Sequence, residues 1–321
     1  MIKRRKNRTM SVKSEIVLMI ISDLLLLAVL LNGFALFHHV LPRSLIHEGM
    51  TIVRPADTYP KDENGMWGEK FSDKFLPEGE TKRTESSYIS HDINVTLEKV
   101  KRGSATYYVA DIYIRNIDNF KTAFANDTYG KSITESIQDT ASRHNAVIAT
   151  NGDYYGIRDY GICIKNGVLY RRSSFADVCV LYYDGTVKTY KRSEFSLADA
   201  ISNGAYQAWS FGPELLDDGE TVSEFDWSIQ SENPRCAFGY YEPGHYCLIL
   251  IDGRQPGYSM GMTFQEMSFM FKEMGCTAAY NMDGGQSAKM VFGDKLVNRP
   301  TKGGRDTSDI IFIAETEDTK R

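Results

Sequence analysis

The feature that most constrains this chain is an almost unbroken apolar run from Ile16 to Val40. A bilayer span needs about 20 apolar residues, whereas a cleaved signal peptide has a shorter apolar region of roughly 7–15 residues and a small-residue cleavage site. This run is longer, and no convincing site precedes Pro42. Asp23 interrupts the run and is costly inside a membrane, although it lies toward the N-terminal end. We therefore expect an uncleaved transmembrane anchor over residues 16–41.

The charges around this run predict its orientation. Residues 1–15 hold one acidic residue, Glu15, and six of the 37 basic residues, which are Lys3, Arg4, Arg5, Lys6, Arg8 and Lys13. Basic residues beside a span favour the cytoplasm, so we expect a cytoplasmic tail over 1–15 and an extracellular C-terminal domain. The remaining chain is more acidic than the net charge of −5 for the whole. An acidic domain repels a phosphate backbone, so nucleic acid is not an expected partner.

The cysteine pattern argues against a disulfide-rich or zinc-binding domain. They are five in number, scattered, and without Cys-x-x-Cys spacing: Cys163, Cys179, Cys236, Cys247 and Cys276. This pattern excludes a dense disulfide framework and a typical zinc site. We interpret them as buried apolar residues, with room for one disulfide that the sequence does not identify.

Beyond the anchor, the composition changes at about residue 88. Residues 42–87 are rich in Pro, Gly and charge without a sustained period, so we expect an extracytoplasmic stalk there. Short strand patterns follow, and the turn pairs Asn166-Gly167 and Asp184-Gly185 predict β-hairpins. We expect one folded domain over 88–316 and a polar tail over 317–321.

Two segments carry helix signals, over residues 132–145 and 263–275. Each begins with Ser or Thr and has Glu three residues later, the pattern of a capping box. Few helices among many short strands indicate an α+β fold. We expect a single strand-rich domain on a mixed sheet, preceded by one transmembrane helix.

Each predicted helix leads into a short apolar strand and then into an Asn-x-Asp loop. The first loop begins Asn151-Gly152-Asp153, and the second runs from Asn281 through Asp283, Gly284, Gly285 and Gln286 to Ser287. A rigid strand that ends in an amide, a carboxylate and flexible glycine backbone can present a polar site, and free N–H groups there can hold an anion. One such loop alone is better explained as a turn. Two loops in matched contexts favour a site.

Two arginines flank other apolar strands. The strand 247–251 runs into Asp252-Gly253-Arg254, and Arg235 opens the strand pattern that follows Asn233-Pro234. A guanidinium group can grip a phosphate or a carboxylate with two hydrogen bonds. For either arginine taken alone, a structural ion pair is the alternative.

Seven segments resemble, in order, the motifs of the phosphodiester glycosidase family: NGDYYG, SFGPELL, NPRCAFG, LILIDGR, GMTFQEM, NMDGGQSAKM and VNRPTKGGRDTSDIIFI. That family includes an uncovering enzyme, which removes N-acetylglucosamine from a sugar phosphodiester, and bacterial surface proteins linked to exopolysaccharide. The resemblance spans residues 90–314 and implies an α/β domain that hydrolyses a glycosidic bond to phosphate. By motif match it places these residues in the site: Asn151, Asp153, Arg235, Asp252, Arg254, Asp283, Gly284, Gly285 and Ser287.

The chain departs from the family pattern at three positions. Gln286 replaces a usual third glycine, Ala288 replaces a small hydroxyl residue, and Cys236 stands where the family has Thr in Arg-Thr-Ala. These changes affect the expected substrate fit more than the chemistry, because the carboxylates and arginines are retained.

Together with the predicted anchor and its orientation, the resemblance implies a membrane-anchored, extracytoplasmic hydrolase that cleaves a sugar-1-phosphodiester bond in a cell-surface or extracellular polysaccharide. We expect Asp283 to be the main catalytic carboxylate, followed by Asp153, with Asp252 organising the site. The expected substrate-binding residues are Asn151, Arg235, Arg254, Gly284, Gly285 and Ser287. The expected partners are the sugar-phosphate substrate and, through the N-terminal helix, the membrane. No cofactor is expected.

Three other functions start from the same loops. A serine hydrolase would use Ser287, but Lys289 stands where the nucleophile elbow has Gly, and no His lies in a motif loop. The oxygens of Asp153, Asp252 and Asp283 could bind calcium or magnesium in a metal-dependent phosphodiesterase. A non-catalytic, surface-anchored glycan-binding module is the third alternative.

Overall fold

The computed structural model describes residues 12–37, 41, 43–44, 49–60, 64–173 and 175–316. The chain divides into two units, Met1–Arg43 and Ser44–Arg321. Most of the predicted basic tail, and the polar tail over 317–321, lie outside the described residues.

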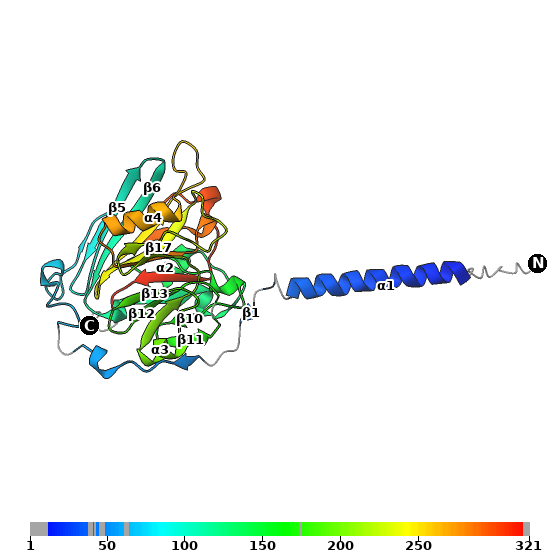
Figure 1. Ribbon diagram of the computed structural model, residues 1–321, viewed down its shortest axis with the longest axis horizontal. Coiled ribbons are helices and arrows are strands. Elements are labelled where there is room, and N and C mark those ends of the chain that lie inside the picture. The colour runs from blue at the N-terminus through cyan, green and yellow to red at the C-terminus, as the bar shows by residue number, and fades with distance from the viewer. Residues whose placement is uncertain are drawn as a thin grey trace, which may run out of the picture. The chain divides into compact units, whose positions relative to one another are not determined.

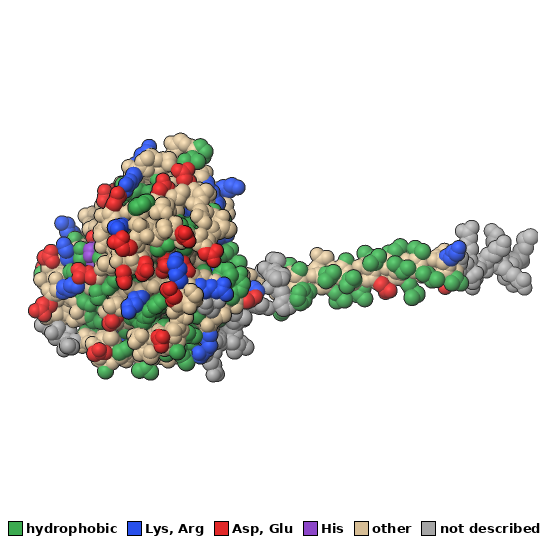
Figure 2. All heavy atoms as spheres, in the orientation of Figure 1, with side chains coloured by type: hydrophobic (Ala, Val, Ile, Leu, Met, Phe, Trp, Pro, Cys, Tyr) green, Lys and Arg blue, Asp and Glu red, His purple; other side chains and the backbone are tan. Residues whose placement is uncertain are grey.

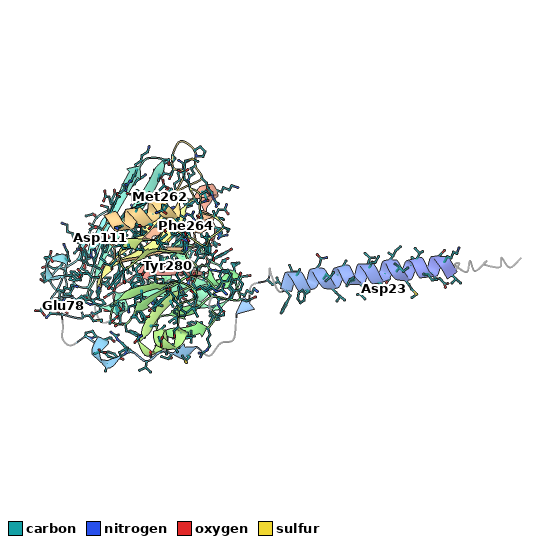
Figure 3. The ribbon with its side chains drawn as sticks, viewed as in Figure 1. Asp23, Glu78, Asp111, Met262, Phe264 and Tyr280 are labelled. Atoms are coloured by element: carbon teal, nitrogen blue, oxygen red, sulfur yellow. The ribbon has the colours of Figure 1, made fainter. Side chains whose placement is uncertain are left out.

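The first unit contains the expected apolar helix, α1 (Val12–Ala35), of 24 residues. After a first turn that carries Lys13 and Glu15, its side chains are mostly apolar and exposed, with Asp23 as a further acidic residue (Figures 2 and 3). The mean hydropathy of its most apolar window is 2.4. At about 1.5 Å per residue the helix is long enough to cross a hydrocarbon layer of about 30 Å. Its length and composition fit a membrane span or a signal sequence.

The second unit is strand-rich, with three main sheets and few helices (Figure 1). In spatial order, the nine-stranded sheet contains β16 (Glu220–Thr221), β15 (Glu214–Asp217), β19 (Ala278–Met282), β17 (Arg235–Glu242), β18 (His245–Ile251), β6 (Ala105–Ile114), β5 (Ile93–Arg102), β4 (Ser87–Ile89) and β3 (Lys82–Arg83). The six-stranded sheet contains β13 (Val187–Tyr190), β12 (Val178–Tyr182), β14 (Ala205–Trp209), β10 (Cys163–Lys165), β11 (Val168–Arg171) and β2 (Met50–Thr51). The five-stranded sheet contains β21 (Lys295–Leu296), β20 (Met290–Phe292), β9 (Ile148–Asn151), β22 (Asp309–Ile313) and β7 (Phe120–Phe124).

The strand-rich α+β architecture is confirmed, but the sheets are antiparallel where we expected a mixed sheet. The two predicted hairpins are present, with β10 paired to β11 around Asn166-Gly167 and β12 paired to β13 around Asp184-Gly185. The long pairs β5–β6 and β17–β18 are antiparallel as well. Short loops can join antiparallel neighbours, whereas parallel strands need a crossover of a dozen or more residues.

One apolar core lies where the three sheets meet. It joins Phe238 and Leu248 of the nine-stranded sheet to Trp209 of the six-stranded sheet and Ile311 of the five-stranded sheet. On its opposite face, the nine-stranded sheet is covered by α4 (Phe264–Glu273). The six-stranded sheet is covered by α3 (Leu197–Ser202), and the five-stranded sheet by α2 (Ile137–Arg143). Strands β17 and β18 are therefore buried on both faces, which explains their continuous apolar sequences.

Of the two predicted helix starts, one is confirmed and the other is wrong. The capping box at Thr263 is present, and α4 begins directly after it. The predicted start at Ser132 is wrong, because Ser132 has a φ of 55° and Ser136 caps the seven-residue α2 instead. The carboxylate of Glu135 binds Arg143, so it forms no capping box with Ser132.

The predicted stalk over 42–87 is wrong for most of its length, since the described residues from 49 onward belong to the folded unit. The aromatic side chains of Trp67, Phe71 and Phe75 are buried in the central core. Strand β2 extends the six-stranded sheet, and β3 and β4 extend the nine-stranded sheet. The burial of these aromatic rings outweighs the turn-rich composition around them.

The cysteines match the interpretation as buried apolar residues. All five are buried with free thiols. The sulfur atoms of Cys247 and Cys276 lie 3.9 Å apart, beneath α4, without a disulfide.

Candidate active site

The predicted loops lie together because β19, β17 and β18 are antiparallel neighbours in the nine-stranded sheet. Arg235 pairs with Ile251, and Cys236 pairs with Met282. The start of β17 therefore lies beside the ends of β18 and β19. This register brings together the three segments that carry Arg235, Arg254 and Asp283.

The loop after β9 joins them from the five-stranded sheet. The Asn151 side-chain amide donates to the Asp283 carbonyl over 2.7 Å, and the Asp283 N–H donates to the Gly152 carbonyl over 3.2 Å. The Asn151 side-chain oxygen accepts from the Lys289 N–H. Asn151 thus positions the Asp283 loop through its backbone.

These loops enclose a pocket of about 280 Å³, which we call the arginine pocket. Five of the expected site residues line it, namely Arg235, Arg254, Asp283, Gly284 and Gly285. Its wall also includes Phe211, Trp227, Ser228, Asn233 and Arg305. Among the described lining residues, Asp283 supplies the single carboxylate beside three guanidinium groups.

Asp283 faces the pocket from a largely buried position, with 7% of its surface exposed. One carboxylate oxygen lies 2.9 Å from a terminal nitrogen of Arg305. The sequence analysis assigned a catalytic role to Asp283 and did not anticipate this ion pair. Burial raises the pKa of Asp283, while Arg305 and Ser287 oppose that effect.

Arg305 is a site residue that the sequence interpretation missed. Its Nε donates to the Ser287 hydroxyl over 2.6 Å, and its guanidinium lies 4.3 Å from the centre of the Tyr154 ring. Ser287 is therefore occupied as an acceptor for this arginine. The Gly-Gly-Arg sequence at 303–305, within the last family motif, was the available signal.

Arg254 reaches the pocket from a strained backbone position. Its φ is 57°, and its Nε donates to the Asn233 side-chain oxygen over 2.8 Å. A Cβ atom at Gly285 would lie 3.4 Å from a terminal nitrogen of Arg254, and Gly285 itself has a φ of 64°. Gly285 thus combines a backbone conformation that suits glycine with close approach to the arginine.

Arg235 lines the same pocket, but its guanidinium group already donates hydrogen bonds to the protein backbone. It donates to the Met262 carbonyl and to two carbonyls of the 229–231 segment, and it lies 4.0 Å from the centre of the Phe264 ring. Met262 and Phe264 lie where α4 begins (Figure 3). Burial and the nearby Arg254 lower its pKa to about 10. These contacts fit a residue that braces the pocket wall.

Asp252 lies directly before the Arg254 turn, and its carboxylate does not line the arginine pocket. It accepts hydrogen bonds from the Asn298 side chain, the Arg299 N–H and the Tyr258 hydroxyl at 2.8–3.0 Å. Burial raises its pKa, and these donors oppose the rise. The organising role of Asp252 stays a prediction.

Asp153 belongs to a buried charge cluster rather than to the pocket lining. One oxygen accepts from the Ser210 N–H, and the other lies 3.6 Å from the Lys165 ammonium. Lys165 also contacts Asp309 at 2.9 Å. Burial raises the pKa of Asp309 to about 6, although Lys165 opposes the shift. Lys165 lies in none of the quoted motifs, and Asp309 lies in the last one, but nothing in the sequence indicated that they meet, because their contact depends on long-range packing.

The three aspartates do not converge on one point that could hold a cation. Asp283 binds Arg305, Asp153 binds Lys165, and the Asp252 carboxylate is bound by three donors. Across the described parts of the chain, no group of three His, Cys, Asp or Glu residues is arranged to hold a metal ion.

A buried carboxylate beside several guanidinium groups, presented from glycine-rich strand ends, defines a site suited to an anionic ester. A sequence model described as phosphodiester glycosidase matches residues 144–314, more than half of the chain. The chain belongs to the phosphodiester glycosidase family, which confirms the resemblance seen in the seven motifs.

Among curated proteins, the chain is similar to the SPbeta prophage-derived uncharacterized protein YomE of Bacillus subtilis (strain 168). The two are 29% identical over 298 residues, which is 83% of this chain and 46% of YomE. This chain therefore spans less than half of that relative.

Two solved structures share the fold. The zebrafish N-acetylglucosamine-1-phosphodiester alpha-N-acetylglucosaminidase catalytic domain, auto-inhibited by its pro-peptide, has a TM-score of 0.58 at 18% identity and covers 85% of this chain and 97% of its own. A hypothetical protein from Synechocystis has a TM-score of 0.54 at 14% identity and covers 74% of this chain and 64% of its own. At these identities the likeness concerns the fold.

Proposed function

We propose that this chain is a glycosidase that hydrolyses the bond between a sugar's anomeric carbon and the phosphate of a phosphodiester. The observation that carries the proposal is the arginine pocket, in which Asp283 lies beside Arg254 and Arg305. Membership of the phosphodiester glycosidase family supports the same chemistry. The name of the zebrafish structure, an enzyme acting on a sugar-1-phosphodiester, agrees with it.

The leaving group explains why arginines suit this reaction. Ordinary glycosidases protonate a sugar hydroxyl as it departs, using a carboxylic acid. A phosphate monoester leaves as an anion, because its second pKa is about 6. Guanidinium groups neutralise that developing charge and fix its orientation. Asp283 is then free to act on the anomeric carbon or on the attacking water.

Arg254 and Arg305 are the proposed phosphate ligands, with Arg235 as a support. Arg235 donates to three backbone carbonyls, so most of its hydrogen-bonding capacity is used. Arg254 uses its Nε for Asn233, and its terminal nitrogens lie beside Gly285 in the pocket. Arg305 is half exposed, with 39% of its side-chain surface accessible.

We further propose that α1 anchors the enzyme in a membrane and that the folded unit acts outside the cytoplasm. The apolar length of α1 and the basic residues before it support this orientation. A cell-surface or extracellular polysaccharide containing sugar-1-phosphodiester links is the proposed substrate.

The test compares two leaving groups in the detergent-solubilised full-length chain. Release of free sugar from defined sugar-1-phosphodiesters is measured for the wild type, Arg254→Ala and the matched control Arg102→Ala, whose arginine forms an exposed pair with Glu273. Arg254→Ala should reduce turnover of the phosphodiester by about 10²–10³-fold. Arg102→Ala should turn over the phosphodiester at the wild-type rate. An aryl glycoside of the same sugar, if turned over, should be affected far less.

Equal losses on the two substrates would contradict a phosphate-binding role for Arg254. No release of sugar from any phosphodiester by the wild type would contradict the proposed activity. Treatment with a chelator should leave the activity intact. Loss that calcium or magnesium restores would instead favour the metal-dependent phosphodiesterase.

A further inference from the structure

A second pocket, of about 330 Å³, adjoins the arginine pocket. The side chains relevant here are Phe175, Asp177, Arg192, Asp226, Trp227 and Ser228. Trp227 and Ser228 line both pockets. This short segment is therefore the boundary between them, and a ligand that extends across it would occupy both.

Two aromatic rings, of Phe175 and Trp227, line the second pocket, and each packs on another aromatic ring. The Trp227 ring packs on Phe211 with ring centres 5.0 Å apart, and the Phe175 ring packs on Tyr160 at 4.2 Å. The Arg158 guanidinium lies 5.1 Å from the Phe211 ring centre and 5.7 Å from that of Phe175. Arg158 thus ties the aromatic walls of the two pockets together.

The two pockets differ in charge. The arginine pocket offers three guanidinium groups and one carboxylate. The second pocket is lined by two aspartates, Asp226 and Asp177, and by one arginine, Arg192. The Asp177 carboxylate already accepts from two backbone N–H groups and lies 3.4 Å from the Lys191 ammonium, so Asp226 is the carboxylate on which the contrast mainly depends. Carboxylates repel a phosphate group, but they accept hydrogen bonds from hydroxyl groups. An uncharged polyhydroxylated ring is the ligand that combines hydroxyl donors with faces able to pack on Phe175 and Trp227.

We propose that the second pocket binds the sugar ring that is joined to the phosphate held in the arginine pocket. This inference rests on the proposed function, which places the phosphodiester beside Arg254 and Arg305. Trp227 then contacts the substrate at the junction of sugar and phosphate, and Phe175 contacts the sugar side alone. These two aromatic residues determine which sugars are accepted.

The tryptophans provide a measurement of sugar binding that does not depend on turnover. The chain has three, and Trp67 and Trp209 are 7% and 0% exposed. Trp227 is half-buried and lines both pockets. A sugar that covers Trp227 should therefore change the intrinsic fluorescence, and Trp227→Phe should remove that change.

The experiment titrates the detergent-solubilised full-length chain with free N-acetylglucosamine, glucose and galactose, and separately with inorganic phosphate. Phe175→Ala is compared with Phe269→Ala, whose phenylalanine is 52% exposed on α4 and lines neither pocket. For the sugar that binds, Phe175→Ala should weaken affinity by about tenfold, while phosphate affinity and the control stay unchanged. On a sugar-1-phosphodiester, the same variant should raise KM with little change in kcat.

The outcomes separate this inference from the proposed function. If none of the sugars changes the Trp227 signal, or if Phe175→Ala leaves both sugar affinity and KM unchanged, the sugar site is overturned even where hydrolysis is observed. If sugar binding depends on Phe175 while no phosphodiester is hydrolysed, the sugar site stands and the catalytic proposal fails.

Discussion

At the scale of single residues, Asp283 is subject to two opposed influences. Burial raises its pKa, and the neighbouring Arg305 and Ser287 lower it, with burial the larger effect. The carboxylate is the form that can act on the anomeric carbon or deprotonate water. In the proposed reaction, the protonation of Asp283 would therefore set the pH dependence of turnover.

We predict that Asp283→Asn lowers turnover of a sugar phosphodiester by at least about 10²-fold, with little change in melting temperature, because the amide has the same shape. The acidic limb of the wild-type pH profile should lie above the usual pKa of an aspartate. Arg305→Met removes an influence that lowers this pKa, so the limb should move to higher pH. Initial rates across pH test both statements. A large fall in melting temperature for Asp283→Asn, with activity reduced in proportion, would show a structural role.

The buried cluster of Lys165, Asp153 and Asp309 has one cation for two carboxylates. The two acids raise the pKa of Lys165 against the effect of burial. The raised pKa of Asp309 means that its protonated form is favoured in the folded state. Its contribution to stability is thus present at low pH and is lost as the pH rises through about 6.

We predict that Lys165→Met at pH 7 lowers the free energy of unfolding by about 3–5 kcal/mol, since it leaves two buried acids without their cation. Asp309→Asn removes only the excess carboxylate and should cost much less. It should also reduce the loss of stability as the pH rises from about 4 to 6. Urea unfolding at several pH values measures both effects. Equal costs for the two variants would contradict this account of the cluster.

The sequence could identify some site residues and not others, for a physical reason. Asp283, Arg254 and the glycines stand in loops whose composition shows locally that a strand ends. Lys165 lies in a strand whose pattern indicates only burial, and Asp309 lies in the last family motif, but their contact joins residues 144 positions apart and has no local signal. Arg235 and Asp153 were assigned from motifs, but their hydrogen-bond partners decide whether they face the pocket. Those partners are set by long-range packing.

At the scale of elements, the hairpins and α4 were predictable because their signals are local. The turn pairs at 166–167 and 184–185 and the capping box at Thr263 each specify a few consecutive residues. The pairing of β15 with β19 or of β6 with β18 has no comparable signal, because the partners are far apart in the chain. The segment 64–75 was misassigned since its buried rings are sparse among turn-forming residues.

We predict that this segment contributes to stability as part of the core. Trp67→Ala should lower the free energy of unfolding by about 3–5 kcal/mol, because it empties a buried aromatic site. Tyr59→Ala, at a tyrosine that is 55% exposed, is the matched control and should change stability far less. Denaturant unfolding of the three proteins compares them. If Trp67→Ala costs no more than the control, the segment behaves as a linker after all.

At the scale of the whole molecule, the folded unit begins earlier in the chain than the sequence indicated. Residues 49–60 and 64–87 add strands and core side chains to the sheets, so they are not available as a long spacer. In the sequence, the described part of the folded unit is continuous from residue 49, whereas α1 ends at Ala35.

This arrangement leads to the prediction on location. The full-length chain should fractionate with membranes and resist extraction at high salt, because α1 is long and apolar enough to span the hydrocarbon layer. Protease added outside intact cells should release a soluble, folded fragment, and its N-terminus should lie before Ile52, whose side chain is buried in the sheet core. Cleavage within 64–75 would require unfolding of the core and should be far slower. N-terminal sequencing of the released fragment decides the matter. A soluble form that begins near Pro42 without added protease would show that α1 is a cleaved signal sequence, and protection of the folded unit from external protease would place it in the cytoplasm.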